Sequence, residues 1–578
     1  MTPTRRTSLA RLLPPFALCA LASACGGSDE AQAAAPPPTA AGLAAACPGM
    51  SSTAVAAALP VARTAITTAS LVAATATDPE HCRIDGEINR RTGTDGQSYA
   101  IRFRLRMPTS TWNGRFFMGG GGGTNGNLVD PTSRLAQGYA TIGTDGGHDN
   151  ATNSVATAGG TSAFGLDYQA RVDFAYNAYD KVTQVGKALV SAFYKQDPKY
   201  SYFVGCSEGG REGMLMTQRF PSHYDGVVAG APVLHIPLGP LAGLHTTQLF
   251  AGLARRSGLF FPNGDPAIVK TYSDTDLLLF RNAVLGACDS LDGLADGIVD
   301  NQPACTTALV STKLAELQCT GAKADSCLSA DQIGTMKQAF AGAVNSQGTQ
   351  LYSDWQWDGG IGGLNGTTYN PSWRSWWIGS YASTTNNATK LNFATAEAVI
   401  YTTPPLPIAT ADSLAYSLNY NFDTEPIKIY ATTAAYPQST AGMTFTDALD
   451  LTQFKARAGK MMMYQGSSDS SVSVKDTLRW YDAMNQHMGS NAQDFARMFV
   501  VPGMAHCSGG PGTDKFDMLP QLVEWVEKGV APDSVVAAAS NPGYFGVTSR
   551  TRPLCPYPKQ TRYKGSGDIN DAANFTCQ

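Results

Sequence analysis

The sequence has few charged residues and no excess of positive charge. Only 15% of its 578 residues are charged, and 42 Lys and Arg residues stand against 46 Asp and Glu residues, for a net charge of −4. A nucleic-acid-binding protein normally carries a basic face, so no nucleic-acid partner is expected. The low charge and the 43% of apolar residues also exclude global disorder and predict a large folded core.

Long hydrophobic runs are absent as well, apart from an N-terminal stretch that prolines interrupt. Arg5, Arg6 and Arg11 accompany the short apolar run 12–21, which is the pattern of an export signal. We therefore expect residues 1–24 to be a signal peptide and the mature chain to have no spanning helix.

Two hypotheses for the end of this signal stay open. Ala22-Ser23-Ala24 suits ordinary signal-peptidase cleavage, whereas small residues before Cys25 suit a lipoprotein anchored through Cys25. In either case the protein is expected to be exported, as a periplasmic protein, an outer-membrane lipoprotein or a secreted protein. The Pro- and Ala-rich residues 25–46 are expected to be a tether outside the fold.

The sequence also lacks a C-x-x-C pair with matching Cys or His ligands, so no zinc site is expected. Ten cysteines remain when Cys19 and Cys25 of the N-terminal segment are set aside. An even number in an exported chain predicts five disulfides rather than buried thiols. The ten are Cys47, Cys82, Cys206, Cys288, Cys305, Cys319, Cys327, Cys507, Cys555 and Cys577.

Short apolar runs alternate with helical patterns in two parts of the chain, 47–232 and 451–578. This alternation predicts an α/β fold with a mostly parallel sheet. Residues 233–450 lose the rhythm, and we expect them to form a lid domain inserted into the catalytic domain. The predicted strands are 99–107, 115–118, 139–143, 201–205, 226–230, 460–464 and 495–501, and the predicted helices include 174–194, 208–220, 478–488 and 519–526.

Ser207 lies in Gly205-Cys206-Ser207-Glu208-Gly209, which is the G-x-S-x-G pattern of a nucleophile elbow. The turn from strand to helix is so tight there that the residues two before and two after the serine must be small. The pattern alone is weak in a chain with 59 glycines, and an ordinary glycine-rich turn is the alternative. The predicted strand before Ser207 and helix after it favour the elbow.

The chain order of an α/β-hydrolase triad, nucleophile then acid then histidine, leaves few partners for Ser207. His487 falls within a predicted helix, whereas His506 follows a predicted strand. Asp469 follows the strand 460–464 and is the candidate acid, with a turn-capping Asp as the alternative. Ser207 would attack an acyl carbon, His506 would accept its proton, and Asp469 would fix the imidazole tautomer.

Two cysteines are the sequence neighbours of the predicted nucleophile and base. Cys206 precedes Ser207, and Cys507 follows His506. If the triad forms, the two thiols come close together. A disulfide between them would then tie the nucleophile to the base.

An oxyanion hole needs two backbone N–H donors. We expect one from Glu208, directly after the nucleophile, and the other from Gly121 in the glycine-rich loop 119–123. That loop lacks the Gly-Lys-Ser/Thr of a phosphate-binding loop. A plain flexible loop is the alternative.

These motifs resemble those of the tannase and feruloyl esterase family of α/β-hydrolases. The resemblance rests on Gly-Cys206-Ser207-Glu-Gly-Gly-Arg-Glu-Gly, on Asp469, and on Pro-Gly-Met-Ala-His506-Cys507-Ser-Gly-Gly-Pro-Gly, and it extends from Cys47 to Cys577. It implies an α/β-hydrolase fold with an inserted lid, a serine carboxylic-ester hydrolase activity and no organic cofactor. It also implies the disulfides Cys206–Cys507, Cys47–Cys82, Cys288–Cys305, Cys319–Cys327 and Cys555–Cys577.

The same resemblance implies a structural calcium ion in the lid. The matching acidic stretch would supply the carboxylates of Asp289, Asp292 and Asp296 and the backbone carbonyls of Leu294 and Ile298. Calcium takes roughly six to eight oxygen ligands from flexible loops of this kind. The spacing is not that of an EF-hand, and a solvated acidic turn is the alternative.

Five positions that the resemblance places around the substrate bear on specificity. Trp376 and Ile236 match pocket walls. Lys390 stands where members that cleave terephthalate monoesters have an Arg for the substrate carboxylate, and Gln465 and Val472 stand where those members have His and Phe. Lys lacks the bidentate fork of Arg.

The resemblance therefore implies a small-molecule substrate that is an aromatic-acid ester. Terephthalate monoesters are the first expectation, and ferulate or gallate esters are the alternative. A catalytically silent lipoprotein that binds aromatic ligands and a peptidase on the same scaffold are the competing hypotheses. A monomer is expected.

Overall fold

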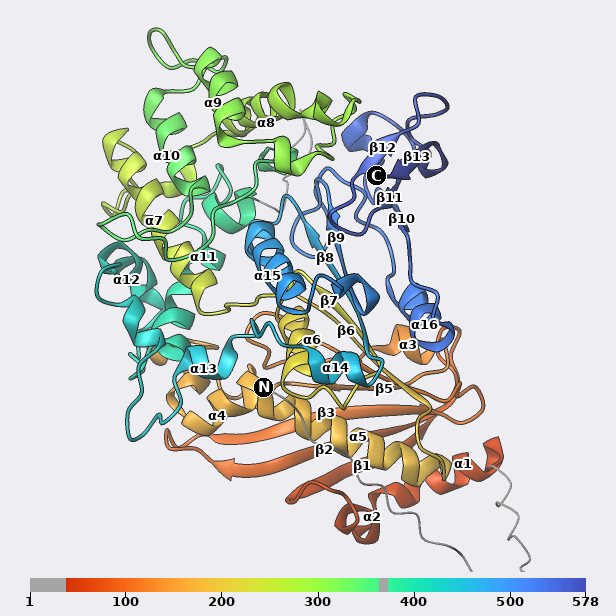
Figure 1. The fold of residues 1–578 in the computed structure, drawn as a ribbon. Coiled ribbons are helices and arrows are strands. Elements are labelled where there is room, and N and C mark those ends of the chain that lie inside the picture. The colour runs from red at the N-terminus through yellow and green to blue at the C-terminus, as the bar shows by residue number, and fades with distance from the viewer. Residues whose placement is uncertain (1–37, 363–372) are drawn as a thin grey trace, which may run out of the picture. The chain divides into compact units, whose positions relative to one another are not determined.

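A nine-stranded mixed sheet runs through the computed structural model, which describes residues 38–362 and 373–578 (Figure 1). The strand order is β1-β2-β3-β5-β4-β6-β7-β8-β9. β1, β2, β3 and β5 pair antiparallel in turn, and every pairing from β5 to β9 is parallel. The strands are β1 (Thr64–Val72), β2 (His81–Thr92), β3 (Ser98–Pro108), β4 (Arg115–Gly119), β5 (Ala140–Thr144), β6 (Tyr200–Cys206), β7 (Gly226–Gly230), β8 (Lys460–Gly466) and β9 (Ala496–Val501).

The antiparallel edge and the parallel centre of the sheet have different side-chain patterns. In β3, the buried Ile101, Phe103 and Leu105 alternate with partly exposed arginines, because one face of this edge meets the core and the other meets water. β5 and β7 are buried at every residue, as expected for strands that are covered on both faces.

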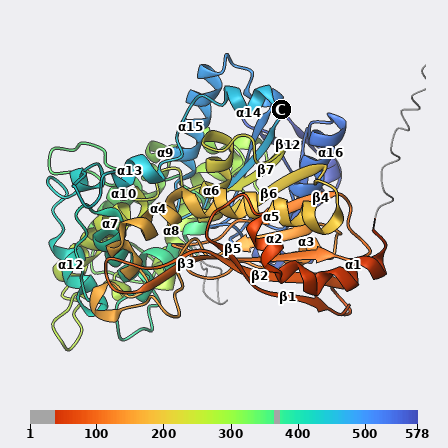
Figure 2. The same cartoon turned by 90° about the horizontal axis from the view of Figure 1, so that it is seen from below.

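Helices cover both faces of the parallel strands. On one face, α5 (Ala178–Tyr194), α6 (Glu208–Gln218) and α15 (Val474–His487) share an apolar core with side chains of β6 to β9. On the other face, α16 (Leu519–Lys528) packs Leu522 and Trp525 against the sheet. α5 contacts β3, β4 and β5 (Figure 2). The sequence therefore predicted the parallel part of the sheet and its covering helices correctly.

The chain leaves the sheet after β7 and returns to it at β8. The described residues of this insertion, 231–459, contribute helices and turns and no strand to the sheet, and they have a second apolar core around Trp355, Trp357, Trp373 and Trp377. Its helices, yellow through green to blue in Figure 1, are α7 (Leu238–Arg256), α8 (Asp274–Cys288), α9 (Thr307–Glu316), α10 (Ala330–Phe340), α11 (Ala388–Thr395), α12 (Ser413–Asn419), α13 (Thr440–Thr444) and α14 (Thr452–Ala456).

The remaining elements are short. They are α2 (Thr53–Ala57), α3 (Thr132–Leu135), α4 (Tyr168–Val172), the two-stranded sheets β10 (Val535–Ala538) with β11 (Thr551–Leu554) and β12 (Thr561–Tyr563) with β13 (Phe575–Cys577), and π-helical turns at Asp173–Asn177, Arg374–Ile378 and Ala396–Tyr401. Among the described residues, no helix has both the length and the apolar composition needed to cross a membrane.

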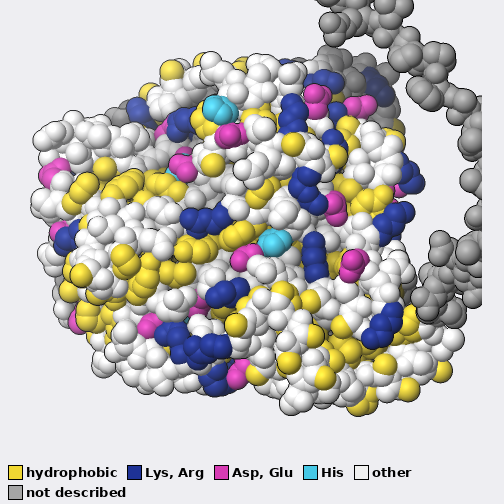
Figure 3. All heavy atoms as spheres, turned by 60° about the horizontal axis from the view of Figure 1, so that its bottom comes forward, with side chains coloured by type: hydrophobic (Ala, Val, Ile, Leu, Met, Phe, Trp, Pro, Cys, Tyr) yellow, Lys and Arg dark blue, Asp and Glu magenta, His cyan; other side chains and the backbone are white. Residues whose placement is uncertain are grey.

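On the face shown in Figure 3, Lys and Arg side chains lie among Asp, Glu and apolar ones.

The structure corrects the predicted tether 25–46 at its C-terminal end. Residues Ala40–Ala46 form α1, whose N-cap Thr39 accepts a hydrogen bond from the N–H of Gly42. Leu43 is buried in the main core, which anchors the helix. The signal peptide, its cleavage site and Cys25 lie outside the described residues, and the predicted lid boundaries stay predictions.

Candidate active site

Ser207 occupies a strained turn between the end of β6 and the start of α6. Its φ of 65° and ψ of −121° are rare for a residue with a side chain. A Cβ on Gly205 would lie 2.4 Å from the carbonyl oxygen of Gly209, and a Cβ on Gly209 would lie 2.8 Å from that of Gly121. The two glycines of the motif are therefore required by close backbone contacts, as in a nucleophile elbow.

Asp469 and His506 meet at the carboxyl ends of two neighbouring strands. Asp469 follows β8, His506 follows β9, and His506 Nδ1 lies 2.9 Å from Asp469 Oδ2. The other carboxylate oxygen accepts the N–H groups of Ser471 and Val472 at 2.8 and 3.0 Å. This carboxylate is thus held in place while it orients the imidazole.

The five disulfides are formed with the pairing that the family resemblance implied. Cys206–Cys507 has an S–S distance of 2.04 Å and a Cα–Cα distance of 6.0 Å. It joins the residue before Ser207 to the residue after His506. The other four are Cys47–Cys82, Cys288–Cys305, Cys319–Cys327 and Cys555–Cys577. Five disulfides indicate an exported protein.

The N–H groups of the two predicted oxyanion donors, Glu208 and Gly121, have different surroundings in the structure. Glu208 begins α6, where the first N–H groups of a helix have no partner in the helix, and it lines the same cavity as Ser207 and His506. The N–H of Gly121 instead points to Glu212, with its nitrogen 3.1 Å from Oε2. This contact corrects the expectation for Gly121; Gly122, the next residue, lines the cavity.

Glu212 is a buried carboxyl group that the sequence analysis missed. Besides Gly121, it accepts a hydrogen bond from Asn125 Nδ2 at 3.0 Å. Burial, together with the negative charge of Glu208, raises the pKa of Glu212 to about 8. Glu208 itself pairs with Arg211, with Arg211 Nε 2.9 Å from Oε2. The signal available in the sequence was a glutamate about one turn after Ser207 in a predicted helix. The structure shows that this helix is buried at almost every residue.

A cavity of about 530 Å³ opens above Ser207, and half of the residues that line it besides Ser207 and His506 come from the insertion. The ring of Trp376 meets that of His506 edge-on at 5.7 Å and stacks with that of Phe393 at 6.0 Å. Ile236 and Tyr401 also line the cavity. Its volume and its mixture of apolar walls with a few polar groups are typical of a small-molecule site.

Two other predicted pocket positions, Gln465 and Val472, do not line this cavity. Gln465 is fully buried and donates a hydrogen bond from Nε2 to the carbonyl of Val472 at 2.7 Å. Gln465 and Val472 therefore support the loop that carries Asp469 without facing the cavity. Lys390 belongs to α11, whose residues Asn392 and Phe393 line the cavity. The side chain of Lys390 lies outside the described residues.

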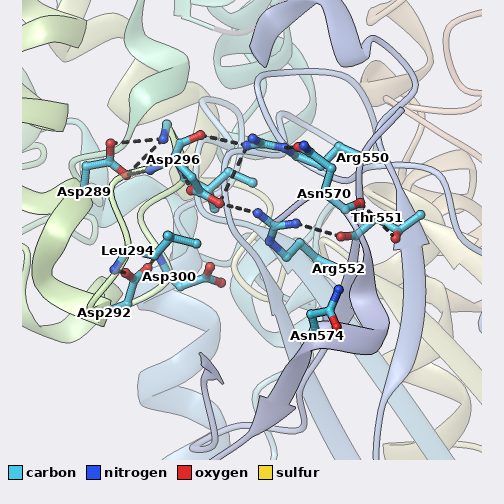
Figure 4. Close-up of polar contacts among 12 residues, drawn as sticks. Asp289, Asp292, Leu294, Asp296, Asp300, Arg550, Thr551, Arg552, Asn570 and Asn574 are labelled. Carbon is cyan, nitrogen blue, oxygen red and sulfur yellow. Dashed lines mark hydrogen bonds and ion pairs between the residues drawn. The ribbon is translucent and has the colours of Figure 1, made fainter. Parts of the chain in front are cut away.

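The acidic segment fits a cation in part (Figure 4). Burial raises the pKa values of Asp289 and Asp292, and the nearby charge of Asp296 adds to the effect, so a cation at this turn would offset the repulsion between the carboxylates. Asp296, however, turns to the C-terminal segment, where it forms ion pairs with Arg552 and Arg550.

No group of three or more His, Cys, Asp or Glu side chains is arranged as a metal site in the part of the chain that the structure describes. Of the three predicted carboxylates, Asp296 is paired with two arginines, whereas Asp289 and Asp292 form no ion pair with another described residue. Leu294 and Ile298 belong to the same turn and donate their N–H groups to Asp292 and Asp296.

Comparison with known proteins decides the family. The model of the family described as "Tannase and feruloyl esterase" matches residues 82–578. The chain belongs to this family. It is 52% identical over 526 residues to mono(2-hydroxyethyl) terephthalate hydrolase of Piscinibacter sakaiensis, covering 88% of this chain and 86% of the relative. It is 31% identical over 499 residues to probable feruloyl esterase B of Emericella nidulans, covering 81% of each.

Solved structures of the tannase and feruloyl esterase family share the fold. Feruloyl esterase B from Aspergillus oryzae superimposes with a TM-score of 0.70 at 25% identity over 93% of this chain and the whole of that chain. Tannin acyl hydrolase from Aspergillus niger does so with a TM-score of 0.64 at 22% identity over 94% and 96%. The predicted family, the α/β-hydrolase fold and the enzyme class, a carboxylic ester hydrolase, are confirmed.

Proposed function

We propose that the chain hydrolyses esters of aromatic acids through an acyl-enzyme intermediate, with Ser207 as nucleophile, His506 as general base and Asp469 as the group that orients the base. The observation that carries the proposal is the hydrogen bond between His506 Nδ1 and Asp469 Oδ2 at the rim of the cavity that also holds Ser207. This hydrogen bond leaves Nε2 of His506 for the serine hydroxyl.

The reaction has two steps. Ser207 Oγ forms a bond to the acyl carbon as its proton passes to His506, and the bond to the alcohol breaks as the alcohol takes that proton. A water molecule then attacks the acyl carbon, gives its proton to His506 and releases the acid, and Ser207 recovers its proton. The N–H groups of Glu208 and Gly122 would stabilise the oxyanion in each step.

A terephthalate monoester is the first substrate to test. The relative of 52% identity is named for this activity, and Trp376 and Phe393 offer flat apolar surface for an aromatic acyl group. In this proposal Lys390 attracts the distal carboxylate as a point charge. Feruloyl esterase relatives favour ferulate esters as the second candidate.

We further propose a calcium ion at the acidic segment, bound by Asp289, Asp292 and the carbonyl groups of Leu294 and Ile298. Asp296 would join only by leaving Arg552. The ion would hold this turn of the insertion together by charge neutralisation. The proposed location is the periplasm, the outer membrane through Cys25, or the medium, and the proposed state is a monomer.

The test is hydrolysis of a panel of esters by the mature chain, with Ser207→Ala as the blank. The panel holds mono(2-hydroxyethyl) terephthalate, a methyl ferulate, a methyl gallate, a short aliphatic ester and the amide of one aromatic acid. We expect the terephthalate monoester to be cleaved with the highest kcat/KM. Aromatic binding without turnover would contradict an esterase, and equal cleavage of the amide would favour the peptidase hypothesis.

A further inference from the structure

Asp358 is a buried carboxylate of the insertion that receives hydrogen bonds from several segments of the chain. Its side chain belongs to a residue that is 3% exposed. Oδ1 accepts from Ser468 Oγ at 2.5 Å, and Oδ2 accepts from Ser467 Oγ at 2.6 Å and from Gln302 Nε2 at 2.8 Å. Longer contacts, at 3.3 and 3.4 Å, come from the N–H groups of Gly360 and Gly503.

These hydrogen bonds are the direct contacts of the Asp358 carboxylate, and the nearby cation Arg281 interacts with it only at longer range. Across residues 38–362 and 373–578, no Lys or Arg side chain forms an ion pair with Asp358. A buried carboxylate is costly unless it is paired or fully hydrogen-bonded. The donors are therefore required by the charge, and the charge in turn fixes the positions of the donors.

Three of the donors belong to the two loops that carry the proposed acid and base, whereas Gln302 and Gly360 belong to the insertion itself. Ser467 and Ser468 directly precede Asp469, and Gly503 lies three residues before His506. Ser467 Oγ also accepts the N–H of Gly503 at 2.8 Å. Asp358 thus lies where the loop after β8 meets the loop after β9.

Backbone contacts between the two loops complete this arrangement. The N–H of Ser467 donates to the carbonyl of Val501 at 3.1 Å, and that of Ser468 donates to the carbonyl of Met504 at 3.1 Å. The separation of Asp469 from His506 therefore depends on how these loops are held against each other. A displacement of about 1 Å in a catalytic group costs roughly 100-fold in rate.

We propose that Asp358 is a positioning residue that sets the relative placement of Asp469 and His506. It acts through Ser467, Ser468 and Gly503, and it does not line the substrate cavity. The inference rests on the proposed function, because it takes Asp469 and His506 to be the catalytic acid and base. Its consequence is that the insertion, besides forming the wall of the pocket, aligns the triad.

The experiment compares Asp358→Asn with Asp276→Asn in the mature chain. Asp276 is also a buried carboxylate of the insertion, bonded to Ser273, Gln332 and Lys323, and it contacts neither catalytic loop. We expect Asp358→Asn to lower kcat by roughly 10- to 100-fold with KM for the ester little changed. Asp276→Asn should keep the wild-type kcat at temperatures where both variants are folded.

A spectroscopic measurement separates positioning from a loss of stability. The proton on His506 Nδ1, hydrogen-bonded to Asp469, gives a low-field ¹H NMR resonance that Asp469→Ala should remove. Asp358→Asn should shift or broaden this resonance, and Asp276→Asn should leave it in place. If Asp358→Asn keeps both the wild-type kcat and the resonance, the positioning role is wrong, while an inactive Ser207→Ala would still support the triad.

A second variant decides the question if Asp358→Asn does not fold. Ser467→Ala combined with Ser468→Ala removes the same hydrogen bonds from the other side and leaves Asp358 in place. The double variant should show the same fall in kcat at unchanged KM. A wild-type kcat in this double variant would overturn the proposal.

Discussion

Cys206 and Cys507 form a disulfide that joins the residue before Ser207, the proposed nucleophile, to the residue after His506, the proposed base. The two cysteines are 301 positions apart in sequence, and β7 and β8 lie between the strands that lead to them. Cys507 also has a positive φ of 64°, so the chain turns sharply on leaving His506. The bridge is a covalent constraint on a distance that would otherwise depend on loop packing.

Removal of this disulfide should therefore affect activity as well as stability. Cys206→Ala with Cys507→Ala is expected to cost about 2–5 kcal/mol in the free energy of unfolding and to lower kcat, because the relative placement of Ser207 and His506 then depends on non-covalent contacts alone. Thermal unfolding and ester hydrolysis are the measurements. Cys555→Ala with Cys577→Ala is the control and should lower stability alone. A wild-type kcat without the first bridge would show that it has no catalytic role.

Glu212 predicts a pH dependence of stability. Its pKa of about 8 in the folded chain lies above the ordinary carboxyl value because of burial and the charge of Glu208. The stability from the protonated form is present below the ordinary carboxyl pKa and is lost as the pH rises through 8. Glu212→Gln cannot lose this proton, so its Tm should fall less than that of the wild type between about pH 5 and pH 8.5.

Melting curves across this pH range are the measurement for Glu212. Glu524→Gln, on the exposed side of α16, is the matched control and should follow the wild-type curve. Parallel curves for the wild type and Glu212→Gln would contradict a raised pKa. Because Glu212 also holds the N–H of Gly121, a smaller kcat in Glu212→Gln is expected from movement of the glycine loop.

Calcium removal should lower the Tm without removing a catalytic group. A chelator is expected to destabilise the wild type, since Asp289 and Asp292 would repel each other without a cation, and added calcium should restore the Tm. Asp289→Asn should abolish the response, and Asp265→Asn, in another part of the insertion, should keep it. Elemental analysis that finds no stoichiometric calcium would refute the site.

Lys390→Arg tests the proposed contact with the substrate carboxylate. An Arg can bind a carboxylate through two parallel hydrogen bonds, whereas Lys acts as a single point charge. We expect kcat/KM to rise several-fold for a terephthalate monoester and to stay unchanged for its neutral methyl ester. Equal changes for the two substrates would mean that residue 390 does not contact the carboxylate.

The sequence predicted the parts of the molecule that depend on local pattern and chain order. Ser207, Asp469 and His506 could be proposed as a triad because a tight turn needs glycines and because each candidate followed a predicted strand, and the structure brings Asp469 and His506 into contact. The adjacency of Cys206 and Cys507 to two of these residues was visible for the same reason. These patterns depend on neighbouring residues and on chain order, and folding changes neither.

Features that depend on tertiary contacts were missed or misplaced. The sequence could not show that Glu212, on α6, accepts the N–H of Gly121, which leaves Gly122 as the proposed oxyanion donor. β1 and β2 were missed because they lie on the antiparallel side of the sheet, where β1 has no buried residue and β2 buries fewer than half of its residues. Asp296 has the residue type of a calcium ligand, but Arg550 and Arg552, more than 250 positions away, compete for it.

The hydrogen bonds of Asp358 define what can be exchanged between relatives of this chain. A chimera that takes only the segment between β7 and β8 from another member would import the carboxylate at position 358. The residues that donate hydrogen bonds to it at positions 467, 468 and 503 would still be those of the host. Where the host lacks hydroxyl groups at positions 467 and 468, the imported carboxylate would be buried without these two hydrogen-bond donors. To transfer a pocket between members of this fold, the segment between β7 and β8 should be exchanged together with residues 466–469 and the turn at Gly503.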